Sequence, residues 1–162
     1  MDFMKKKLKI VGIGNTILSD NKITFLVMEK LNTIIRNDDI DIGFITSTGM
    51  TLLDAIEGFT HLILIDTVKT GKVMVGEVLR YSLSDYDLSP RGKMISGLTL
   101  KEIFLLGEKM GLMMPGEVHI LGIEIEEDKI ISEEVSQKLL AAIDYIADKT
   151  LTTIKEMNFK IN

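Results

Sequence analysis

The chain has 162 residues, of which 46% are hydrophobic and 27% are charged, so it can bury the core of one domain. The absence of cysteine excludes a disulfide framework, a thiolate metal site and a cysteine nucleophile. A formal net charge of −5 argues against nucleic acid as the main partner, because phosphate binding requires a basic face. No apolar run approaches the roughly 20 residues that a membrane span needs. We therefore expect one cytoplasmic domain over residues 1–162, with no membrane partner.

The first predicted element is a strand over residues 8–13 (LKIVGI), followed by a glycine-containing loop. Gly12 and Gly14 allow backbone conformations barred to other residues and leave room for a close-approaching partner. Asn15 can stabilise the loop, because asparagine tolerates a left-handed backbone. Asp20 opens a segment with helical apolar spacing and can cap that helix. Such a strand, loop and helix place sites at strand ends in parallel α/β proteins.

Four further β-rich runs follow along the chain. Three of them are almost continuously apolar, as expected of parallel strands that are covered on both faces. The remaining run alternates between apolar and polar residues and fits an edge strand. The three apolar strands are predicted at residues 41–46, 61–66 and 117–123, and the edge strand at residues 76–82.

Helical patterns separate these runs, and three of them begin with residues suited to a first helical turn. Thr51 with Asp54 opens a short helix, and Thr99 with Glu102 has the spacing of a capping box. Ser132, followed by two glutamates, opens the last helix. The alternation of strands and helices predicts an α/β fold: a three-layer αβα sandwich with a mostly parallel sheet of about five strands.

Polar residues gather where the predicted strands end, and the carboxyl ends of parallel strands share one edge of a sheet. Asp66 ends the apolar run LILID, where a carboxylate must be solvated, hydrogen-bonded or paired. Asp66 and Asp20 are therefore the candidate catalytic carboxylates, and Glu124 follows the last strand. The candidate substrate-binding residues on the same edge are Gly12, Gly14, Asn15, Thr48 and Gly49.

Other motifs find little support in the sequence. The glycine loop lacks the third glycine of a dinucleotide fingerprint, and the chain has neither a GKS or GKT phosphate loop nor a GxSxG element. The chain has two histidines, which cannot alone complete the four-ligand set of a structural zinc site. His119 lies inside a predicted strand, where we expect it to face the core. His61 begins a strand at the edge opposite to the predicted site.

Four segments, GIGNTILSDN, STGMTLLDAIEGFTHLILIDTV, GLTLKEIF and VHILGIEIE, resemble the hydrogenase maturation proteases in order and spacing. These proteases trim the C-terminal extension from the large subunit of nickel–iron hydrogenases. The resemblance implies an αβα sandwich, a monomer, and a hydrogenase-like large subunit precursor as partner. The first segment matches the family's opening motif with Gly12, Gly14, Asn15, Leu18 and Asp20.

Two positions depart from the family pattern at the implied metal contacts. The family lines its cleft with an acid after the loop aspartate, the aspartate that ends the third strand, and a histidine before the third helix. Here these positions are Asn21, Asp66 and Ser96. One carboxylate among neutral oxygens holds nickel or zinc poorly. The resemblance therefore implies no tightly bound cofactor, and we expect weakened sensing of nickel carried by the substrate.

Three hypotheses follow from these residues. In the first, the chain is an endopeptidase in which Asp20 and Asp66 polarise water or position the scissile peptide. In the second, it is a non-catalytic homologue that binds a hydrogenase-like subunit as an assembly factor, because Asn21 and Ser96 replace two metal contacts. A third hypothesis, a small-molecule hydrolase, has no specific support in the sequence.

Overall fold

A computed structural model describes residues 4–14, 20–87, 98–126 and 134–162. Its five strands are β1 (Leu8–Ile13), β2 (Ile40–Ile45), β3 (His61–Val68), β4 (Val78–Tyr81) and β5 (Glu117–Glu124). They form one sheet in the order β2-β1-β3-β5-β4, in which only β4 runs antiparallel to its neighbour. The predicted mostly parallel, five-stranded sheet is confirmed, and so is the position of the alternating run at an edge.

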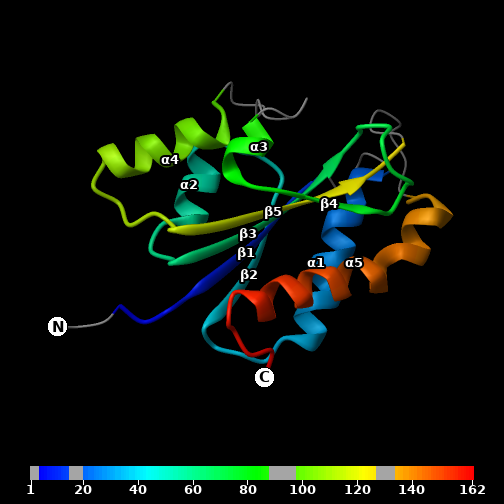
Figure 1. Ribbon diagram of the computed structural model, residues 1–162, viewed down its shortest axis with the longest axis horizontal. Coiled ribbons are helices and arrows are strands. Elements are labelled where there is room, and N and C mark those ends of the chain that lie inside the picture. Colours follow the sequence, from blue (N-terminus) through cyan, green and yellow to red (C-terminus); the bar gives the residue numbers. More distant parts are fainter. Residues whose placement is uncertain (1–3, 15–19, 88–97, 127–133) are drawn as a thin grey trace.

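Helices cover both faces of this sheet, as Figure 1 shows. Helices α1 and α5 pack on one face, and α2, α3 and α4 pack on the other. This arrangement confirms the predicted αβα sandwich. No helix in the described ranges combines the length and apolar character that crossing a membrane requires. The helices are α1 (Ile23–Ile34), α2 (Met50–Ile56), α3 (Leu83–Asp87), α4 (Leu100–Lys109) and α5 (Gln137–Glu156), and a 3-10 turn, η1 (Asp20–Lys22), precedes α1.

Two hydrophobic cores lie on the two faces because successive strand residues point in opposite directions. In β3, Ile63 and Ile65 enter the core beneath α1 and α5, whereas Leu62 and Leu64 enter the core beneath α2 and α4. All four side chains are fully buried. Each contributes about 1.5–3 kcal/mol of transfer free energy, which explains why the central strand is apolar along almost its whole length.

One predicted helix start is confirmed. The Thr99 hydroxyl accepts a hydrogen bond from the Glu102 backbone N–H at 3.1 Å, and the Glu102 carboxylate accepts one from the Thr99 N–H at 2.6 Å. This reciprocal pair is the capping box expected from the spacing. It fixes the first turn of α4 with local interactions only.

Two other predicted helix starts, at Asp20 and Thr51, are wrong. Helix α1 begins at Ile23 rather than at Asp20, and its N-cap residue, Lys22, makes no capping bond through its side chain. Helix α2 has Gly49 rather than Thr51 at its N-cap, with a φ of 78° that favours glycine. Helix α5 begins at Gln137, and the predicted start at Ser132 lies outside the described residues.

Candidate functional site

The strand order has its switch point at the carboxyl ends of β1 and β3. The chain leaves β1 towards β2 on one side and later enters β3 on the other side, so the connections diverge at this point. Such switch points are where open parallel sheets hold their ligands. Asp66 and Thr67 lie near the end of β3, and the η1 turn contributes Asn21 to the same place.

Asp66 is buried, with 6% of its surface exposed, and its carboxylate is held from two sides. Oδ1 accepts a hydrogen bond from the Thr67 backbone N–H at 2.7 Å, and Oδ2 accepts one from the Tyr86 hydroxyl at 2.6 Å. Tyr86 is itself fully buried and stacks edge-on against Tyr81, with ring centroids 6.1 Å apart. These bonds explain how an apolar strand tolerates a carboxylate, and they fix its orientation.

Asn21 lies on the other side of β3 from Tyr86. The Thr67 hydroxyl donates to Asn21 Oδ1 at 2.5 Å, and both side chains are buried. Thr67 and Asp66 are consecutive strand residues, so their side chains leave the strand on opposite faces. The amide oxygen of Asn21, the atom suited to contact a cation, therefore already has a partner in its own chain.

Asp20 has a different role from the expected cap of α1. Its side chain is buried, and Oδ1 accepts a hydrogen bond from the backbone N–H of Ser136, the N-cap residue of α5, at 3.1 Å. An acid at this end of α5 also complements the helix dipole. Asp20 thus joins η1 to α5, and within the described ranges no hydrogen bond links it to Asp66.

Packing within the chain itself requires glycine at positions 12 and 14. A Cβ at Gly12 would lie 2.6 Å from Met28 Cγ in α1, and one at Gly14 would lie 2.6 Å from the Asn21 backbone oxygen. The close-approaching partner that the loop accommodates is therefore α1 with its preceding turn. Substrate binding by these glycines stays a prediction.

Of the remaining predicted site residues, the structure describes Thr48 and Gly49. Thr48 carries a buried hydroxyl that has no hydrogen-bond partner among the described residues. Gly49 supplies the positive φ at the start of α2. Asn15 and Ser96 lie outside the described residues, so their roles stay predictions.

Glu124 is a further buried carboxylate at this edge, and it secures the loop that follows β3. Oε1 accepts hydrogen bonds from the backbone N–H groups of Thr70 at 2.9 Å and Gly71 at 2.6 Å, and Oε2 accepts one from the Thr70 hydroxyl at 2.9 Å. Burial, with a smaller contribution from the Glu124 charge, raises the pKa of Tyr81. Sequence reasoning placed Glu124 at the edge but missed Thr70 and Tyr86, because neither follows a recognisable motif.

Within the described ranges, no group of three histidine, cysteine, aspartate or glutamate residues could hold a metal ion. The expected core position of His119 is wrong: its ring lies 3.0 Å from Glu117 Oε1 and 3.2 Å from an Arg80 nitrogen in a partly exposed position. His61 begins β3 at the amino end of the sheet, as expected.

Solved structures of hydrogenase maturation endopeptidases share this fold. The hydrogenase maturating endopeptidase HybD from E. coli is 22% identical, with 93% of each chain covered and a TM-score of 0.74. The hydrogenase 2 maturation peptidase from Thaumarchaeota archaeon SCGC_AB-539-E09 is 23% identical, with 92% of this chain and 98% of that chain covered and a TM-score of 0.65. The NiFe hydrogenase maturation protease HycI from Thermococcus kodakarensis KOD1 is 20% identical, with 93% and 94% covered and a TM-score of 0.68. No known family model and no curated protein matches the chain. The resemblance predicted from the sequence is confirmed at the level of the fold.

Proposed function

We propose that this chain binds the C-terminal segment of a hydrogenase-like large subunit precursor at the carboxyl edge of its sheet. The observation that carries the proposal is the position of Asp66: a buried, oriented carboxylate at the switch point of a fold shared end to end with maturation endopeptidases. An extended peptide laid across this edge would meet Asp66. We further propose a cytoplasmic monomer without a tightly bound cofactor.

Removal of that segment by peptide hydrolysis is the first candidate activity, since the structural neighbours are endopeptidases. In this reaction Asp66 would orient water or accept its proton, because the Tyr86 hydroxyl and the Thr67 N–H hold the carboxylate in one direction. Asp20 would contribute a second negative charge, and the backbone of the Gly12–Gly14 loop or Asn15 would hold the scissile carbonyl.

Binding without cleavage is the second candidate, and it is favoured by the hydrogen bond between Thr67 and Asn21. A nickel ion carried by the substrate would meet Asp66 together with a neutral amide that is already bonded and, at the third position, Ser96. Divalent metals of this class prefer anionic or imidazole ligands. An assembly factor that holds its client needs a binding surface on this fold but no such ligand set.

The test is incubation of the pure chain with a hydrogenase-like large subunit precursor, followed by size-exclusion chromatography and intact-mass measurement. A precursor that loses its C-terminal segment with the native chain but not with Asp66→Asn supports hydrolysis. A stable complex with unchanged precursor mass supports the assembly role. If the precursor neither binds nor loses mass with any hydrogenase-like client tested, the proposed function is wrong.

Restoring the family's metal contacts gives a second test of the same site. The double variant Asn21→Glu with Ser96→His should bind nickel or zinc if these are the contact positions that the resemblance implies, because it restores their carboxylate and imidazole. Calorimetric titration measures this gain, and adding Asp66→Ala to the double variant should remove it. A folded double variant that binds neither metal would contradict the placement of Asn21 and Ser96 at the contact positions.

A further inference from the structure

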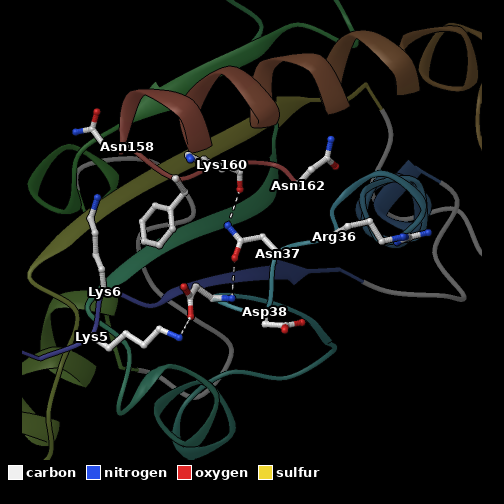
Figure 2. Close-up of a pocket in the computed structure, with 10 residues that line it drawn as sticks. Lys5, Lys6, Arg36, Asn37, Asp38, Asn158, Lys160 and Asn162 are labelled. Carbon is white, nitrogen blue, oxygen red and sulfur yellow. Dashed lines mark hydrogen bonds and ion pairs between the residues drawn. The ribbon is translucent and has the colours of Figure 1, made fainter.

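An open groove of about 540 Å³ lies at the amino end of the sheet, opposite to the edge that carries Asp66. Three segments that are distant in sequence form it: residues 5–6 before β1, residues 36–39 between α1 and β2, and residues 158–162 after α5 (Figure 2). The volume falls within the range of ligand-binding clefts in proteins.

The charge of the groove is opposite to that of the chain. Its lining has four cationic and two acidic side chains, a net formal charge of +2, whereas the whole chain carries −5. Electrostatic potential of one sign in a hollow attracts ligands of the other sign. The charged residues of the lining are Lys5, Lys6, Arg36, Lys160, Asp38 and Asp39.

Among the described residues, three of these four cations have no ion-pair partner. Only Lys5 forms an ion pair in the groove, with Asp39 at 2.7 Å. Lys6 donates to the Met157 backbone carbonyl, and its ammonium lies 4.4 Å from the centre of the Phe159 ring. Within the described ranges, Lys160 has no ion-pair partner.

The lysines surround the groove rather than meeting at one point. Figure 2 shows Lys6 and Lys160 on segments from opposite ends of the chain, while Lys5 turns to its ion pair. The Arg36 guanidinium lies towards α1, where it donates to the backbone carbonyls of Asn32 at 2.8 Å and Ile35 at 3.0 Å. The two lysines that remain for a ligand are therefore Lys6 and Lys160.

The backbone beneath these lysines is fixed in place. The Arg36 N–H donates to the Ile161 carbonyl at 2.9 Å, and the Asn37 side-chain amide donates to the Lys160 carbonyl at 2.7 Å. Phe159 is buried and packs edge-on against His61, with ring centroids 5.1 Å apart. A ligand therefore meets a preformed surface and pays little to order the backbone.

We propose that this groove binds an acidic segment of a partner protein in extended form, with its carboxylates beside Lys6 and Lys160. A compact anion such as phosphate fits less well, because the carboxylates of Asp38 and Asp39 lie in the same lining and the arginine fork points away. An extended peptide can place acidic residues beside the lysines and neutral or basic residues beside the aspartates. The proposal is independent of the activity at the Asp66 edge.

The experiment titrates the chain into a dye-labelled peptide of alternating Glu and Gly, about ten residues long and so able to reach roughly 33 Å. Fluorescence anisotropy is measured at about 10 mM ionic strength, where charges act over roughly 30 Å. Removing one exposed ion pair weakens such binding about threefold, so Lys160→Gln should raise Kd by about that factor. Adding Lys6→Gln should bring the loss to about tenfold.

Matched controls decide the outcome. Lys101→Gln removes the same charge from an exposed position on α4 and should leave Kd unchanged. Because Lys6 also contacts Phe159, the Lys160→Gln variant alone keeps the test valid if the double variant unfolds. The proposal is overturned if the acidic peptide does not bind, if Lys101→Gln weakens it equally, or if a Gln and Gly peptide binds as tightly. Competition by millimolar inorganic phosphate at constant ionic strength would assign the groove to compact anions and would also overturn it.

Discussion

The two edges of the sheet carry polar side chains that are bonded in different ways. At the carboxyl edge, Asp66 and Glu124 are buried and accept hydrogen bonds from their own chain. At the amino edge, Lys6 and Lys160 line an open groove without a carboxylate partner among the described residues. A ligand at the carboxyl edge must share or displace hydrogen bonds to buried carboxylates, whereas one at the amino edge meets ammonium groups that are not neutralised by a carboxylate among the described residues. Whether a polar side chain is available to a ligand therefore depends on its hydrogen bonds within the chain as well as on its residue type.

The strongest test of this contrast is Glu124→Ala. The substitution removes the acceptor of three hydrogen bonds from Thr70 and Gly71, so it should lower the free energy of unfolding by about 3 kcal/mol. Urea denaturation measures the change. Glu126→Ala, at an exposed position two residues later, should stay within about 0.5 kcal/mol of the native chain. Equal effects of the two substitutions would contradict a structural role for Glu124.

Glycine substitution tests the packing at the two edges. Gly14→Ala, at the carboxyl edge, would place a Cβ 2.6 Å from the Asn21 backbone oxygen and should cost about 2 kcal/mol. Gly116→Ala, just before β5 at the amino edge, meets nothing within 4 Å and should leave stability nearly unchanged. Thermal or urea unfolding of both variants gives the comparison. A tolerated Gly14→Ala would contradict the close packing of Gly14 against η1.

Removing one hydroxyl has a smaller expected effect. Tyr86→Phe leaves Asp66 Oδ2 without its 2.6 Å hydrogen bond and should destabilise the fold by about 1.5 kcal/mol. The neighbouring ring offers the control, since no hydrogen bond of the Tyr81 hydroxyl is among those described, and Tyr81→Phe should change stability little. If both substitutions lower the free energy of unfolding equally, the hydrogen bond between Tyr86 and Asp66 does not contribute measurably to stability.

The smallest predicted effect concerns pH at the amino edge. Burial, aided by the charge of Lys6, lowers the pKa of His61 below 6.5, despite the nearby Glu117 carboxylate. Folding therefore favours the neutral ring. The stability this contributes is fully present above the unfolded pKa of about 6.5 and is lost as pH falls through that value towards the lower folded pKa. The free energy of unfolding should thus fall on acidification below pH ~6.5, and His61→Gln should flatten that fall. If the free energy of unfolding of the native chain rose on acidification below pH ~6.5, the prediction would be wrong.

The sequence predicts the strands well because their signal is local. The first strand agrees to the residue, and β3 extends beyond its predicted end by Thr67 and Val68. Thr67 is polar but fully buried, since its hydroxyl bonds to Asn21, and an apolar run cannot reveal that bond. The capping box at Thr99 was predictable for the same reason, because both partners lie within three residues.

Long-range partners explain what the sequence did not reveal. Asp20 would cap a helix by local rules, but its carboxylate bonds to Ser136, 116 positions away. Asp66 was recognised from its place after an apolar run, yet the hydroxyl that orients it comes from Tyr86, 20 positions later on another element. Spacing along the chain predicts which residues reach the edge of a sheet, but tertiary packing decides which atoms they meet.

The return of the chain to its starting edge also affects how the protein can be handled. Residues 158–162 pack beside residues 36–39, close to the lysines that precede β1 (Figures 1 and 2). A surface linker attached through the side chain of Asn158 or Asn162 would therefore emerge on the side away from Asp66 and leave the carboxyl edge of the sheet open to a partner.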